Sequence, residues 1–173
     1  MFIRLAKVVL VLQIGLIALL VGVDNIIDYD SNFQFVRHVL SMDTTFPGNA
    51  LMGRAITDPA LHHLAYALII AAEIITGLLC IAGAAWLFRH ISASPVRFQQ
   101  AKSLAVCGLT LGFTLWFFGF LTIGGEWFQM WQSQQWNGQQ AAFRFIVCIG
   151  VVLAILLLPD SDPPAATPER DTE

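Results

Sequence analysis

The sequence predicts an all-α membrane protein, built as a four-transmembrane-helix bundle with short interfacial helices in its outer loops. Its 173 residues are 57% apolar and only 12% charged, whereas about a quarter of the residues in soluble domains are charged. The apolar residues also gather in long runs, and a helix of about 20 residues crosses a hydrocarbon core of about 30 Å. Because lipid offers the backbone no hydrogen-bond partners, an open chain crosses it only as helices.

The four predicted spans cover residues 4–27, 60–88, 103–123 and 141–158. The second follows Asp58 and Pro59, a cap residue before a first-turn proline, which signals the start of a helix. The third contains Gly108 and Gly112, spaced as in the small-residue pairs that let membrane helices approach closely. We therefore expect one membrane domain, residues 1–158, in which the four helices pack together.

Residues 159–173 form an acidic, proline-rich tail with almost no apolar side chains. A segment of this composition cannot bury enough apolar surface to offset the entropy that it would lose on ordering. We therefore expect the whole tail, from the end of the fourth span onward, to be disordered.

The distribution of basic residues predicts the orientation in the membrane. One side of the predicted bundle carries twice as many as the other. The first side has Arg4, Lys7, Arg89, Arg97, Lys102 and Arg170, and the second has Arg37, Arg54 and Arg144. Basic residues favour the cytoplasmic side. Both termini are therefore expected in the cytoplasm, with loops 24–63 and 124–140 outside.

The first outer loop, residues 24–63, is expected to be ordered. A turn and cap signal at Asp30-Ser31-Asn32 precedes apolar residues at helical spacing, from Phe33 to Leu40, which predicts a short surface helix. A proline and a glycine then break the chain. A second short helix is expected over residues 51–56.

The second outer loop contains Trp127, Trp131 and Trp136 among several amide side chains. Tryptophan gathers at membrane surfaces because its ring is amphipathic. The helical spacing of the first part predicts a short amphipathic helix lying on the membrane, with Asn137-Gly138 as the turn into the fourth span. The tryptophans then serve either as an aromatic belt that anchors the bundle or as a docking surface for a lipid headgroup, a quinone or a partner subunit.

Glu73 is the most informative single residue because it lies inside a predicted span. A carboxylate there costs about 2.5 to 3.5 kcal/mol on insertion scales and normally faces the bundle interior with a partner. Counted from the ends of their spans, Glu73 and Arg144 lie at similar depth. We therefore expect an ion pair between them, which would act as a structural clasp, as a proton or ligand site, or as a lipid-facing pair.

The histidines and carboxylates of the outer loops form no recognisable metal or haem motif. His62 and His63 are adjacent, so on a helix their side chains point about 100° apart and do not share a face. Asp24 and Asp28 lie one turn apart but lack the spacing of a calcium-binding loop. We expect no cofactor, and we expect interfacial roles for both histidines.

The sequence shows no paired nucleophile and base and no glycine-rich phosphate loop, so we expect no enzymatic activity. The net charge is −3, and the few basic residues form short clusters beside the spans, which argues against a nucleic-acid partner. The expected partners are membrane lipids, a membrane protein or further copies of the chain.

Four segments of the chain resemble a known bacterial family. They are NFQFVRHVLSMDTTFPG, ALHHLAYALIIAAE, LWFFGFLTIGGEWFQMWQSQQWNGQ and AFRF. They resemble domain-of-unknown-function family 2165, predicted small integral membrane proteins, over about residues 4–159. The resemblance implies four spans and a bacterial inner-membrane location, and it implies no activity. The positions that carry it are Arg37, His38, Asp43, His62, His63, Glu73, Glu126, Trp127, Trp131, Trp136, Asn137 and Arg144.

The leading hypothesis from sequence is a non-enzymatic accessory or interaction protein of the inner (plasma) membrane that binds a partner protein or lipid through its outer loops. A first alternative is a small oligomeric proton-coupled transporter that uses Glu73. A second is a subunit of a respiratory complex that contacts quinone or haem. The long outer loop and the basic asymmetry favour the leading hypothesis over a small exporter, whose loops are minimal.

Overall fold

A computed structural model describes residues 1–160 of the chain, and four helices in it are long and apolar enough to cross a membrane. They are α1 (Phe2–Ile27), α3 (Pro59–Arg89), the composite helix Pro95–Trp127 and α6 (Gln139–Leu157). The composite helix consists of α4 (Pro95–Ala101), α5 (Ser103–Thr114) and η2 (Leu115–Trp127). The predicted all-α, four-span membrane fold is confirmed.

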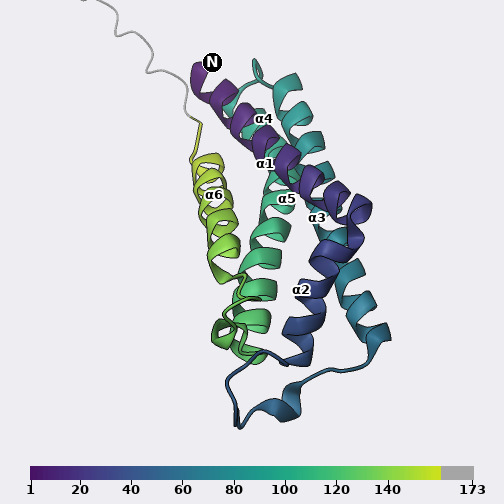
Figure 1. The fold of residues 1–173 in the computed structure, drawn as a ribbon. Coiled ribbons are helices and arrows are strands. Elements are labelled where there is room, and N and C mark those ends of the chain that lie inside the picture. Colours follow the sequence, from purple (N-terminus) through teal and green to yellow (C-terminus); the bar gives the residue numbers. More distant parts are fainter. Residues whose placement is uncertain (161–173) are drawn as a thin grey trace, which may run out of the picture.

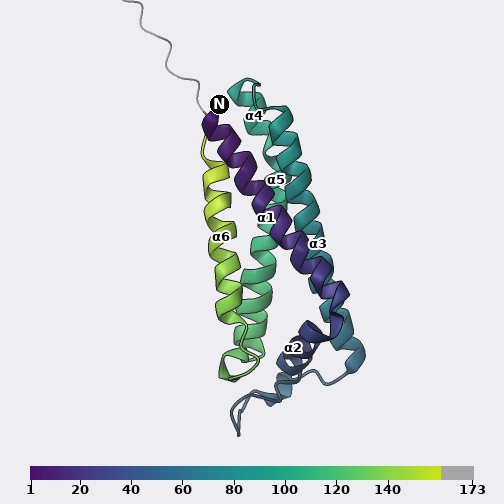
Figure 2. The same ribbon diagram turned by 45° about the horizontal axis from the view of Figure 1, so that its top comes forward.

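The long helices run lengthwise together, and α1 crosses the others at an angle (Figures 1 and 2). The N-terminus, α4 and the end of α6 lie at one end of the bundle (Figure 1). Arg4 fixes this arrangement, because its Nη1 donates hydrogen bonds to the carbonyls of Ile91 and Ala93 in the link between α3 and α4. The opposite end carries the two outer loops.

Small residues bring the helix backbones into close contact. A Cβ atom at Gly77 of α3 would lie 2.7 Å from the backbone nitrogen of Leu19 in α1, and one at Gly108 of α5 would lie 2.8 Å from Cys80 Sγ in α3. The pairing predicted for Gly108 therefore exists, with α3 as its partner. Around these contacts lies one apolar core from all four long helices, which includes Val11, Cys80, Leu109 and Ile149.

The first outer loop contains α2 (Tyr29–Ser41) and a single 3-10 turn, η1 (Met52–Arg54). Both short helices were predicted, but the start of α2 differs. The predicted cap signal at Asp30-Ser31-Asn32 lies inside α2, which begins at Tyr29 directly after α1. Asp28 breaks the two helices apart, and its carboxylate accepts a hydrogen bond from Ser31 Oγ at 2.7 Å.

The second outer loop differs more strongly from its prediction. The third span does not end at residue 123 but continues to Trp127 as η2, a π-helix of 13 residues. Gln129 then adopts a left-handed backbone conformation with φ 55°, which stops the helix. The predicted amphipathic helix is therefore wrong, because only one 3-10 turn, η3 (Met130–Gln132), follows. π-Helices are rare, and most are single-turn bulges inside α-helices, so a run of 13 residues is unusual.

The start of the predicted disordered tail is held in place. Asp160 lies 3.0 Å from Lys7 Nζ and also pairs with Lys102, and its side chain is 5% exposed. Both lysines also donate to the carbonyl of Leu158. The structure thus differs from the prediction at Asp160. The rest of the predicted tail, including Arg170, lies outside the described residues.

Candidate functional site

The two outer loops pack against each other at one end of the bundle. We call residues 42–58 and 128–138 together the outer cap. The Arg54 guanidinium lies 4.5 Å from the centre of the Trp127 ring, and its Nη1 donates to the Trp127 carbonyl at 3.2 Å. The ring of Phe46 meets Trp131 edge-on at 5.9 Å. Both contacts join the first outer loop to the tryptophan-rich segment, as the sequence predicted.

Ser133 is the hydrogen-bonding centre of the outer cap. Its buried hydroxyl accepts hydrogen bonds from Thr44 Oγ1 and from the Trp136 backbone, both at 2.9 Å. The Trp136 ring stacks on His38 at 4.7 Å, and His38 Nδ1 lies 2.8 Å from an Asp43 carboxylate oxygen. Three residues that the sequence singled out, His38, Asp43 and Trp136, are thus neighbours.

The other singled-out residues of the second loop have separate roles. Trp127 and Trp131 are exposed, at 53% and 44%, in keeping with an aromatic belt. The Asn137 side chain accepts a hydrogen bond from the backbone N–H of Gln139, the first residue of α6, at 3.1 Å. Glu126 is exposed, and its backbone carbonyl, not its carboxylate, contacts Arg54.

Both histidines at the start of α3 hold neighbouring segments in place. His62 is buried, and its Nε2 lies 2.7 Å from the carbonyl of Ile56 in the first outer loop. His63 stacks on Phe33 of α2 at 4.1 Å, and its Nδ1 lies 2.9 Å from the hydroxyl of Tyr29. The two rings thus contact different segments, His62 the residues before α3 and His63 α2. With Arg37 and Asp43 they line a polar hollow of about 370 Å³.

Glu73 is buried at 2% exposure, but the ion pair predicted with Arg144 does not form. The Glu73 carboxylate accepts a hydrogen bond from Asn25 Nδ2 of α1 at 2.8 Å. Arg144 is exposed and lines a groove between α1 and α6 with Gln13 and Ile17. The prediction used depth alone, and depth does not determine which way a side chain points around its helix.

Polar groups from three helices meet in a small chamber beside Glu73. Asn32 Nδ2 of α2 donates to Asn25 Oδ1 at 2.6 Å, and Tyr66 donates to the Asn25 carbonyl at 3.3 Å. These residues line the chamber, which has a volume of about 160 Å³ and is also lined by Trp116 and other apolar side chains. We call it the polar chamber.

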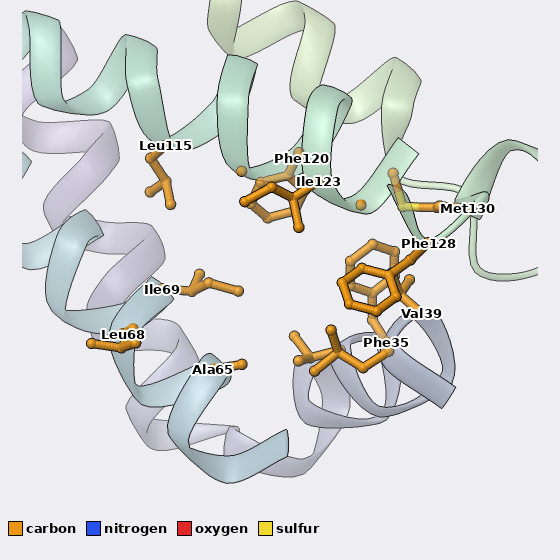
Figure 3. A pocket seen from close by; sticks show the side chains of 14 residues that line it. Phe35, Val39, Ala65, Leu68, Ile69, Leu115, Phe120, Ile123, Phe128 and Met130 are labelled. Carbon is orange, nitrogen blue, oxygen red and sulfur yellow. The ribbon is translucent and has the colours of Figure 1, made fainter. Parts of the chain in front are cut away.

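An apolar cavity of about 230 Å³ lies between α2, α3 and η2, at the level of the polar chamber (Figure 3). In Figure 3 the side chains of Leu115, Phe120 and Ile123 face Ile69 and Ala65 across it. Its lining is almost wholly carbon. The lining residues are Phe35, Val36, Val39, Leu40, Ala65, Leu68, Ile69, Leu115, Gly119, Phe120, Ile123, Gly124, Phe128 and Met130.

Apart from Glu73, the sequence reasoning did not single out the residues that form these two spaces as site residues. Asn25 carried a signal, because it is a polar residue close to the end of a span and is followed seven positions later by Asn32. For the apolar cavity, the sequence contains only a weaker indication: Gly119 lies within an otherwise bulky apolar run. Neither signal shows that α2 folds back over the bundle, and that fold-back is what places Asn32 beside Asn25.

Four spanning helices joined by an ordered outer cap define a small integral membrane protein. The chain belongs to the DUF2165 family of predicted small integral membrane proteins, whose model matches residues 3–159. The resemblance stated from the sequence is therefore confirmed. No curated protein and no solved structure matches the chain.

Proposed function

We propose that this protein is a non-enzymatic membrane protein that binds the apolar chain of a lipid in the cavity between α2, α3 and η2. The observation that carries this proposal is the cavity itself, with its almost wholly carbon lining. Ligand pockets are mostly apolar concave sites of about 300 to 1,000 Å³. At about 230 Å³ this cavity lies below that range, so we infer that it takes a single narrow chain rather than an element of a partner protein.

The position of the cavity supports a lipid as the occupant. Leu68 and Ile123 belong to its lining and are 62% and 39% exposed on the outside of the bundle. On a spanning helix such exposed apolar side chains face acyl chains, so the surrounding lipid has direct access from the side. Phe128 and Met130 close the cavity toward the outer cap.

A cavity-filling variant tests the proposal. A Cβ atom at Gly119 would meet only Leu115 Cδ1, at 3.8 Å, so Gly119→Leu extends into the cavity without a backbone clash. Gly53→Leu adds the same bulk where nothing lies within 4 Å, outside the cavity. We expect lipid that copurifies in mild detergent, measured by native mass spectrometry, to be lost from Gly119→Leu and kept by Gly53→Leu.

Equal lipid content in both variants would refute the cavity as the binding site. The same lipid extract and the visible spectrum of the protein test the respiratory-subunit alternative. A bound quinone or a haem absorbance band would favour that alternative over the binding of a simple lipid chain.

We further propose a bacterial inner-membrane location with both termini in the cytoplasm. The support is the excess of basic residues at the end of the bundle that carries the N-terminus. In cells, a membrane-impermeant maleimide should label Gly53→Cys in the outer cap and spare Ser92→Cys in the α3–α4 link. Cys107 and Cys148 are also exposed in the spans, so both variants are made with these replaced by serine. The reverse labelling pattern would show that both termini lie outside the cytoplasm.

The proton-coupled transporter stays a second candidate because of one observation. Glu73 is buried within a span and connects through Asn25 to Asn32 of α2, which forms a row of polar groups leading toward the outer side. Protein reconstituted in vesicles should then carry protons down an imposed pH gradient, and Glu73→Gln should stop this flux. A flux equal to that of empty vesicles would remove this candidate.

A further inference from the structure

We propose that the polar chamber binds the head group of the same lipid, and that this head group is a hydrogen-bond donor, a hydroxyl or an amine, that bonds to Glu73. This inference rests on the proposed function, because it assigns the head-group chemistry of the lipid whose chain lies in the apolar cavity. It makes the ligand an alcohol or amine with one long apolar chain.

The two spaces are adjacent and share a wall. Phe35, Val36, Ile69 and Phe120 line both the apolar cavity and the polar chamber. For the head of a molecule in the apolar cavity to enter the polar chamber, the side chains of Ile69 and Phe120 in this wall have to move aside. Its chain would occupy the cavity shown in Figure 3 while its head lies in the bundle interior.

The polar chamber offers a carboxylate acceptor, Glu73, with free acceptor positions. Its Asn25 and Asn32 amide groups donate to Glu73 and to Asn25 Oδ1, and the Tyr66 hydroxyl donates to the Asn25 carbonyl. Each of these three groups thus makes one hydrogen bond within the protein, and each asparagine amide keeps a second N–H. The Glu73 carboxylate accepts only the bond from Asn25, at its Oε2, among the hydrogen bonds of the described residues. A carboxylate has about four acceptor positions, so a donor on the ligand would bond to one of the positions that remain free.

The charges of the chamber exclude an anionic head group. No salt bridge formed by residues 1–160 includes Glu73, so a second negative charge beside it would be buried without compensation. An ammonium head would instead supply the cation that a buried carboxylate normally has. A hydroxyl head would donate without adding charge. Both fit a chamber of about 160 Å³, which has no room for a large phosphodiester head.

Ligands with the same chain and different heads test this inference. Dodecanol, dodecylamine, dodecanoic acid and dodecyl phosphate are added to the delipidated full-length protein, and the bound fraction is measured by native mass spectrometry. We expect the alcohol and the amine to bind about tenfold tighter or more than either anion, which is the effect of one charge-assisted hydrogen bond. Equal binding of all four ligands would overturn the head-group assignment while leaving the chain site in place.

Two variants assign the result to this chamber. Glu73→Gln should weaken amine binding about tenfold and dodecanol binding by less, since a glutamine oxygen still accepts from a hydroxyl but without the charge. Arg144→Gln is the matched control, because it removes a charge from a span at a residue that does not line the chamber. It should change the binding of neither dodecanol nor dodecylamine. Amine binding that falls equally in both variants would overturn the role of Glu73.

The failure of this inference and the failure of the proposed function are distinguishable. Gly119→Leu removes room for the chain and should abolish the binding of every ligand in the series. If Gly119→Leu binds all four ligands like the wild type, the chain site itself is wrong. Should Glu73→Gln fail to fold, Asn32→Ala alters the chamber without touching the carboxylate, and it should change head-group preference while keeping chain binding.

Discussion

Asp160 and Lys7 form an ion pair of 3.0 Å across the end of the bundle that carries the N-terminus, although 153 positions separate them in the sequence. Lys102 pairs with the same carboxylate from the start of α5. The three side chains are 2% to 5% exposed. This contact fixes the end of α6 to α1 and to the third span, and it closes the bundle at that end.

Replacing Asp160 with asparagine should destabilise the protein strongly. Breaking a buried pair by removing one partner costs about 3 to 5 kcal/mol, because the remaining charge is left buried without compensation, and here two ammonium groups are left. We expect a clear fall in the thermal unfolding temperature in detergent. Asp24→Asn, at an exposed carboxylate with no ion pair among the described residues, is the control and should melt like the wild type.

The same ion pair predicts a pH dependence. Burial alone would raise the pKa of the Asp160 carboxyl, but hydrogen bonds from Lys102 and Lys7 outweigh burial and hold this pKa below its ordinary value. A carboxyl with a lowered pKa in the folded state adds stability above its unfolded pKa of about 4, and this stability is lost as the pH falls further. Wild type should therefore lose stability below about pH 4 more steeply than Asp160→Asn. If the unfolding temperatures of the two proteins fall equally with pH across this range, the pairing of Asp160 with the two lysines is contradicted.

The spans and the contact between the outer loops were predictable because they depend on long patterns. Runs of about 20 apolar residues indicate spans, and clustered tryptophans indicate a membrane surface, independently of how the helices pack. Asp160 was not predictable in this way. Disorder was predicted from the composition of the whole tail. Composition does not reveal that a single carboxylate, two residues after Leu158, forms a buried ion pair.

The candidate site was predicted in part. Glu73 was identified correctly as buried, but its partner was assigned by depth, and only the packing of α1 on α3 shows that Asn25 faces it. The tryptophan-rich segment was expected to be helical from its spacing. Tertiary contacts outweigh that spacing, because Ser133 and Gln132 bond to Thr44 and Phe46 of the first loop.

The hydrogen bond from Asn25 to Glu73 should be important for stability, whereas Arg144 should not be. Asn25→Ala removes the only side-chain donor that bonds to this carboxylate among the described residues, and leaving such a group unsatisfied costs about 1 to 3 kcal/mol. Arg144→Gln alters an exposed side chain and should stay within about 0.5 kcal/mol of the wild type. Thermal unfolding in one detergent measures both. A larger loss in Arg144→Gln would restore the ion pair expected from the sequence.

Ser133→Ala should loosen the outer cap. The variant leaves the Trp136 backbone N–H and the Thr44 hydroxyl without their acceptor, which costs about 1 to 3 kcal/mol when the groups are buried. Arg54 lies in the part of the outer cap that packs on the tryptophan-rich segment, so trypsin should cleave after it faster in this variant. Gln134→Ala, at an exposed neighbour, should be cut at the wild-type rate. Equal rates in both variants would show that Ser133 does not hold the two loops together.

Gly83→Ala should disturb the packing of α3 against α5. A Cβ atom at Gly83 would lie 2.6 Å from the backbone nitrogen and 2.7 Å from the Cα of Ala105, so one of the two helices must move. Overpacking of this kind costs about 1 to 3 kcal/mol. Gly53→Ala adds the same methyl group where nothing lies within 4 Å, and it should leave the melting temperature unchanged. If Gly83→Ala and Gly53→Ala have the same melting temperature, α3 and α5 are not packed as closely at Gly83 as the distances to Ala105 indicate.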